Sequence, residues 1–127
     1  MKSFSSLLLV ALGGAVGALA RYGLGGVIQG NRTDFPYGTL VINILGCLAM
    51  GVLMGLVPSN IAKPSHRLLL GIGFLGAFTT FSTFSFEALS LFQHHNTTAG
   101  LLYVILSLIG CLAAVALGYL AARAIWG

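Results

Sequence analysis

The sequence predicts an all-α membrane protein in which four helices cross the bilayer. Of its 127 residues, 57% are hydrophobic and only 6% are charged, whereas soluble domains carry about 25% charged residues. The mean hydropathy is +1.00. A helix that spans a bilayer needs about 20 apolar residues, and the chain divides into four such stretches joined by short polar segments. We therefore expect a single four-helix transmembrane domain over residues 1–127.

The expected helices leave no room for an extramembrane domain that could hold a soluble active site, so we expect no enzymatic activity. Their expected bounds are Phe4–Ile28, Tyr37–Val57, His66–Gln93 and Thr98–Ile125. The net charge of +4 comes from basic residues that are scattered singly. Nucleic-acid binding requires a basic patch or run, so nucleic acid is excluded as a partner and the lipid bilayer is expected instead.

The charges at the helix ends give little information about orientation. With four spans, both termini and the middle loop share one side of the membrane, where Lys2, Lys63, Arg67 and Arg123 lie. The other side has Arg21 and Arg32, offset by Asp34. Cytoplasmic loops are normally enriched in Lys and Arg. This weak bias fits either a chain with its termini inside or a chain that inserts both ways.

The first two spans contain glycines at spacings that allow close helix contact. Gly13 and Gly17 form a small-xxx-small pattern, and Gly46, Gly51 and Gly55 repeat small residues along the second span. Such positions let helix backbones approach each other in lipid. They predict tight packing between the helices of this chain.

Two polar residues of these spans are candidates for function. Arg21 lies near the end of the first span, where it either extends to the interface or forms a cationic vestibule that concentrates anions. Asn43 lies within the second span, where an unpaired amide is costly. It is either a link between helices or a source of N–H donors that replace water around an anion.

The centre of the third span is a poor helical sequence. Gly71, Gly73 and Gly76 precede the β-branched pair Thr79-Thr80, which predicts a break in the helix. Broken helices at membrane depth occur where the freed backbone groups line a site. We therefore expect the carbonyls from Gly76 to Thr79 to face a cation or a partner chain.

Hydroxyl and aromatic side chains alternate after this break. Residues 71–87 contain five hydroxyls, five phenylalanines and one carboxylate, Glu87, which is the only acid inside a span. Intramembrane carboxylates mark a proton, a cation or a structural partner. Helical periodicity predicts one shared face after the break. Its residues are Thr80, Thr83, Phe84 and Glu87, bordered by Phe81 and flanked by Ser82 and Ser85.

The fourth span has a semi-polar stripe of Tyr103, Ser107 and Cys111 at helical spacing. This stripe either lines a path or joins two helices. The two cysteines, Cys47 and Cys111, are far apart in sequence and are interpreted as small buried apolar residues.

Two sequence motifs resemble the Fluc (CrcB) family of small bacterial fluoride channels. The first is Gly38-Thr-Leu-x-x-Asn43-x-x-Gly46. The second is Gly-x-x-Gly76-x-x-Thr-Thr-Phe-Ser-Thr-Phe-Ser85, which Glu87 follows. The position of Arg21 also agrees, and the resemblance extends over all four predicted helices.

This resemblance implies a dual-topology homodimer whose two subunits insert antiparallel in the bacterial cytoplasmic (inner) membrane. Two pores at the subunit interface would export fluoride, and a structural Na⁺ would lie at the dimer centre. The residues that match the family's functional positions are Phe81 and Phe84 of a phenylalanine box, Asn43 of the pore, the neighbouring hydroxyls Ser82 and Thr83, the polar track of Tyr103 and Ser107, and the carbonyls of Gly76 and Thr79 around sodium. The family continues the polar track with a hydroxyl where this chain has Cys111.

The physics of the residues agrees with such a pore. Fluoride is strongly hydrated, so a pore must supply hydrogen-bond donors as water leaves. The positive edges of aromatic rings attract an anion weakly, and weak sites favour conduction.

Two alternatives belong to other functional classes. A proton-coupled exporter of the small multidrug-resistance type also has four short helices, but it depends on a carboxylate in the first helix, which this chain lacks. The other alternative is a membrane anchor for a larger enzyme. His66, His94 and His95 lie at the span ends, where haem ligation within the membrane is not expected.

Overall fold

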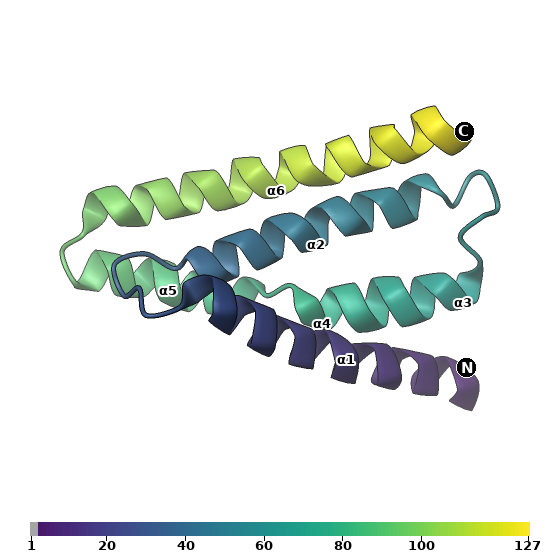
Figure 1. The fold of residues 1–127 in the computed structure, drawn as a ribbon, viewed down its shortest axis with the longest axis horizontal. Coiled ribbons are helices and arrows are strands. Elements are labelled where there is room, and N and C mark those ends of the chain that lie inside the picture. The colour runs from purple at the N-terminus through teal and green to yellow at the C-terminus, as the bar shows by residue number, and fades with distance from the viewer. Residues whose placement is uncertain (1–2) are drawn as a thin grey trace.

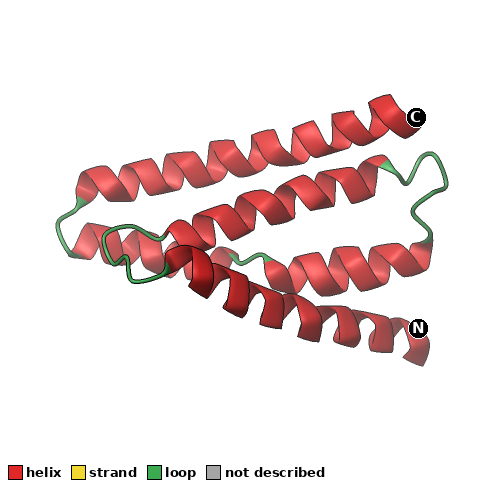
Figure 2. Ribbon diagram, in the orientation of Figure 1, coloured by secondary structure: helices red, strands yellow, loops and turns green. Residues whose placement is uncertain are grey.

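A computed structural model describes residues 3–127, and over that range it contains helices and loops but no strand (Figures 1 and 2). In chain order the elements are α1 (Phe4–Gln29), α2 (Tyr37–Gly55), α3 (Pro64–His66), the π-helix η1 (Arg67–Leu75), α4 (Gly76–Phe78), α5 (Phe81–Gln93) and α6 (Thr97–Trp126). Four helical segments are long and apolar enough to span a membrane: α1, α2, the stretch Pro64–Gln93, and α6. This confirms the four predicted spans, whose bounds differ only at the ends.

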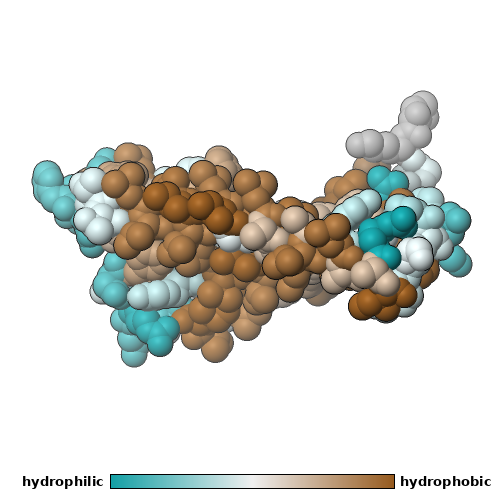
Figure 3. Space-filling model, turned by 90° about the horizontal axis from the view of Figure 1, so that it is seen from above, coloured by the Kyte–Doolittle hydropathy of each residue, from teal (hydrophilic) through white to brown (hydrophobic). Residues whose placement is uncertain are grey.

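The ends of the molecule are polar and its middle is apolar. Both termini and the loop of residues 56–63 lie at one end, and the loops of residues 30–36 and 94–96 lie at the other (Figure 1). Figure 3 shows a band of hydrophobic residues between hydrophilic ends. Lys63 therefore lies at the end opposite Arg32, as expected for four crossings. Lys2 lies outside the described residues.

Helices α1 and η1 touch through their backbones. Gly13 and Gly17 are buried, and a Cβ on either would collide with the backbone of Leu69 or Phe74. Gly73 of η1 faces back toward Gly13 in the same way, with a Cβ position 3.0 Å from the Gly13 Cα. The predicted close contact of the first span is thus confirmed.

Helices α2 and α6 run parallel and form the other tight contact (Figure 1). A Cβ at Gly51 would collide with the Val115 carbonyl oxygen, and one at Gly118 would collide with the Leu48 carbonyl oxygen. These backbone contacts fix the relative position of the two helices. Because the helices are parallel, each further turn along α2 stays opposite the corresponding turn of α6.

Two extended residues separate α4 from α5. Thr79 has φ −90° and ψ 157°, and Thr80 has φ −151° and ψ 121°. The Thr79 hydroxyl donates to the Leu75 carbonyl at 2.9 Å. Thr80 caps α5, since its hydroxyl oxygen accepts from the Thr83 N–H at 3.2 Å. The extended pair therefore has defined hydrogen bonds on both sides.

Candidate functional site

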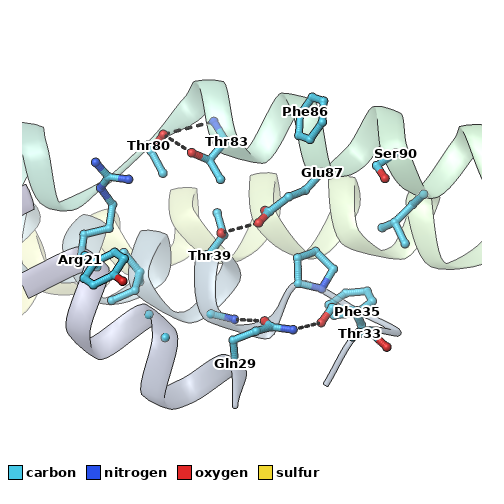
Figure 4. A pocket seen from close by; sticks show the side chains of 17 residues that line it. Arg21, Gln29, Thr33, Phe35, Thr39, Thr80, Thr83, Phe86, Glu87 and Ser90 are labelled. Carbon is cyan, nitrogen blue, oxygen red and sulfur yellow. Dashed lines mark hydrogen bonds between the residues drawn. The ribbon is translucent and has the colours of Figure 1, made fainter. Parts of the chain in front are cut away.

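Two cavities lie beside the extended residues. The larger, of about 590 Å³, is lined mainly by α1, α2 and α5, and its polar residues include Arg21, Gln29, Thr39, Thr83 and Glu87 (Figure 4). The smaller, of about 300 Å³, is lined by Asn43, Cys47, Thr79, Thr80, Phe81, Phe84, Ser107, Leu108, Cys111 and Leu112. Thr80 lines both cavities. The two cavities therefore adjoin at the start of α5.

Asn43 holds the extended backbone in place. Its Nδ2 donates to the Thr80 carbonyl at 3.0 Å, and its Oδ1 accepts from the Thr80 N–H at 2.8 Å. Asn43 is only 9% exposed. A primary amide has two N–H donors, so one N–H is left after this pairing. The amide thus links α2 to Thr80 and retains one donor beside the smaller cavity.

Arg21 contacts the backbone that precedes the two extended residues. Its Nε donates to the Ala77 carbonyl at 3.0 Å, at the end of α4. A cation at the C-terminal end of a helical segment is favourable because the last carbonyls lack partners. Arg21 also lines the larger cavity (Figure 4). The arginine therefore supports the backbone of α4 and places its positive charge at this cavity.

Glu87 is held by two hydroxyl groups. The Thr39 hydroxyl donates to Oε1 at 2.9 Å, and the Tyr103 hydroxyl donates to Oε2 at 2.6 Å. Tyr103 is fully buried. These bonds join α2, α5 and α6 at one point, which satisfies a carboxyl group that would otherwise be costly at this depth.

The aromatic rings of α5 lie next to this network. The Phe81 and Phe84 ring centroids are 5.3 Å apart, and the Phe84 and Tyr103 centroids are also 5.3 Å apart. Phe84 is 7% exposed, whereas Phe81 is 72% exposed. One ring is thus fixed in the core, and the other forms an open wall of the smaller cavity.

Ser107 provides a free hydroxyl in the smaller cavity. It is 5% exposed, and within residues 3–127 its hydroxyl oxygen has no hydrogen-bond partner. Buried polar atoms almost always have hydrogen-bond partners, so an unpartnered hydroxyl that lines a cavity is a candidate ligand group. The serine and the remaining N–H of Asn43 are therefore available to a ligand.

The polar residues of α2 and α6 are matched turn by turn. Thr39 and Tyr103 meet at Glu87. Asn43 and Ser107, one turn further along each helix, line the smaller cavity together. This arrangement follows from the parallel contact of the two helices, and it forms a continuous polar row.

The structure distributes the predicted residues of the third span between the two cavities. Thr83 and Glu87 line the larger cavity, whereas Phe84 lines the smaller. The residues predicted to share one helix face therefore line two different cavities. The reason is that α5 begins between the cavities. Ser82 is exposed and lies outside both, with its hydroxyl 3.3 Å from that of Thr80.

Sequence reasoning missed Thr39, which holds Glu87. The available signal was its spacing, because it precedes Asn43 by one helical turn.

The carbonyls of the extended segment differ in their partners. Those of Leu75, Ala77 and Thr80 accept hydrogen bonds. Within residues 3–127, no hydrogen bond reaches the carbonyl oxygens of Gly76 or Thr79, because the Thr80 and Thr83 N–H groups are bound elsewhere. These two oxygens are therefore free to hold a hard cation.

The chain is similar to a known protein family and to several known proteins. The family model described as "CrcB-like protein, Camphor Resistance (CrcB)" matches residues 8–119. A "Fluoride-specific ion channel FluC" of Shewanella baltica is 47% identical over 115 residues, which cover 90% of this chain and 93% of the relative. One of Nitratidesulfovibrio vulgaris is 48% identical over 99 residues, covering 76% and 80%.

A protein of the same name from Chloroflexus aurantiacus is 43% identical over 116 residues, which cover 90% of this chain and 92% of the relative. These names describe an ion channel and not an enzyme. A family match over most of the chain, with relatives of similar length, is sufficient for assignment: the chain belongs to the CrcB-like family.

Proposed function

We propose that this protein is a passive fluoride channel that exports the ion across the cytoplasmic (inner) membrane of a bacterium. Its relatives carry the name fluoride-specific ion channel and come from bacteria. The observation that carries the proposal is the smaller cavity. There, the unpartnered hydroxyl of Ser107 and the spare N–H of Asn43 lie near the Phe81 and Phe84 rings.

In this mechanism the protein replaces the water that fluoride loses. Asn43 and Ser107 donate hydrogen bonds to the anion, and Phe81 and Phe84 offer the positive edges of their rings. No fixed cation lines the smaller cavity within the described residues. Several weak sites let the ion leave as readily as it enters.

The larger cavity serves as the vestibule. Arg21 attracts anions there. Thr83 lines this larger cavity and Thr80 lines both cavities, so the ion passes these two hydroxyls on its way to the smaller cavity. Glu87 has both oxygens engaged by Thr39 and Tyr103, so it acts as a structural anchor of the polar row.

The walls of the passage are completed by a second copy of the chain. Four helices are too few to enclose a pore, and Phe81 is 72% exposed although it lines the smaller cavity. Two subunits inserted antiparallel would cover this side of each other and form two equivalent pores by symmetry. The bias of basic residues toward one end is weak, which is compatible with insertion in both directions.

A structural Na⁺ at the dimer centre fits the free carbonyls of Gly76 and Thr79. Hard oxygen ligands suit such a cation, and the two subunits would each contribute this pair. Bound there, the ion would join the two extended segments and add a fixed positive charge near the passage.

Fluoride efflux from liposomes that contain only this protein tests the proposal. We expect fast passive efflux without a proton gradient, measured with a fluoride electrode. Flux that requires a proton gradient would instead indicate the exporter class, and no flux from correctly folded protein would reject both.

A further inference from the structure

The two cysteines of the chain are neighbours in the structure. Cys47 of α2 and Cys111 of α6 are the only cysteines in the sequence. Both are free thiols, and both line the smaller cavity. The sequence interpretation treated them as unrelated buried residues, because they are far apart in the chain.

The contact between α2 and α6 explains why they meet. Gly51 packs against the Val115 backbone, and Cys47 and Cys111 each lie one helical turn before that contact. The helices run parallel, so the turn that precedes the contact on one helix faces the same turn on the other (Figure 1). The two thiols therefore lie on facing turns of two helices whose backbones are in contact, and they open into the same cavity.

We propose that Cys47 and Cys111 form a two-thiol binding site for a soft metal ion that accepts two ligands, such as Ag⁺, Cu⁺ or Hg²⁺. Thiolate sulfur selects soft ions. Each cysteine gives up its thiol proton and forms one metal–sulfur bond, so binding releases two protons for each ion. The described residues include no group of three or more His, Cys, Asp or Glu side chains that could hold a metal. The described residues of one chain therefore offer two thiols here and not the four-ligand set that zinc requires.

The site has a consequence for conduction, and this consequence rests on the proposed function. Cys47 and Cys111 lie one turn beyond Asn43 and Ser107 in the same cavity. A metal ion bound between the thiols would occupy the passage and halt fluoride movement.

Metal binding is measured first, without transport. Purified protein in detergent is titrated with Hg²⁺, and the sulfur-to-mercury charge-transfer absorbance is recorded. We expect saturation at about one ion per chain. Cys47→Ser and Cys111→Ser should each weaken binding roughly a hundredfold, because the second bond of a two-ligand site is intramolecular. The double variant should not bind.

Several results would overturn the site. These are single variants that bind as tightly as the wild type, two ions bound per chain, or no binding by protein with free thiols. Cys47→Ala and Cys111→Ala provide a second pair of variants, and size-exclusion chromatography identifies any that misfold.

Transport separates this inference from the proposed function. Hg²⁺ should block fluoride efflux in wild-type liposomes, and the block in each variant is expressed relative to its own metal-free rate. Conduction without metal binding would reject the thiol site alone. Metal binding by a protein that never conducts fluoride would reject the proposed function and leave the thiol site standing.

Discussion

At the scale of single residues, Asn43 combines a structural and a proposed ligand role. It uses one N–H and its oxygen on the Thr80 backbone, and it has one N–H left at the smaller cavity. Only an amide side chain offers two donors and an acceptor together. A hydroxyl in its place could not make both bonds and still donate to an ion.

Asn43→Ala is expected to impair both roles. Loss of the two hydrogen bonds should destabilise the protein by about 0.6–2 kcal/mol for each bond, measured by thermal unfolding in detergent. Loss of a donor to a dehydrated anion should slow fluoride efflux about tenfold or more. Asn31→Ala, at an exposed loop position outside both cavities, is the matched control. Wild-type rates in the Asn43 variant would contradict the pore assignment.

Phe81→Ile separates the aromatic character of the cavity wall from its bulk. Ile is apolar but has no positive ring edge, so efflux should fall by about tenfold, while the proposed dimer should remain assembled in size-exclusion chromatography. Phe4→Ile is the control, because Phe4 is 76% exposed, close to the 72% of Phe81, and lines neither cavity. Unchanged flux in the Phe81 variant would show that this ring does not contact the ion.

At the scale of helices, the contact between α2 and α6 positions the polar row. Thr39 and Tyr103, Asn43 and Ser107, and the two cysteines are matched only because Gly51 and Gly118 bring the backbones together. A side chain at either glycine must push the helices apart. The row would then lose its register.

Gly51→Ala is therefore expected to destabilise the protein by about 1–3 kcal/mol, the typical cost of overpacking, and to reduce efflux in parallel. Thermal unfolding in detergent measures the first effect. Gly23→Ala is the matched control, because a Cβ at Gly23 meets no atom within 4 Å. Equal stability of the two variants would mean that the helices separate without cost.

At the scale of the whole molecule, the proposed antiparallel pair predicts on which side of the membrane each end of the chain is exposed. Ser65→Cys and Asn31→Cys place single labels at opposite ends in a background without Cys47 and Cys111. A membrane-impermeant maleimide applied to intact spheroplasts should label the same fraction of the protein in both variants. Labelling of only one variant would establish a single orientation and remove the antiparallel pair.

Much of the fold could be predicted from the sequence because lipid imposes simple rules. Apolar length determined the four spans, and small-residue spacing indicated the tight contact of α1 through Gly13 and Gly17. The candidate site was predictable as a set of residues. Hydroxyls and a carboxylate are costly in lipid, so their presence inside a span indicates a functional or structural role. Their partners were not predictable, as Thr39 shows, because the partner of Glu87 lies on another helix.

By itself the sequence determined a four-helix membrane protein and the polar residues on which its proposed function depends. Only the tertiary structure decided that Asn43 pairs with Thr80, that Ser107 is left without a partner, and that the two cysteines meet. The physical reason is that periodicity assigns a residue to a face of its own helix, whereas the register between helices is set by backbone contacts at a few glycines.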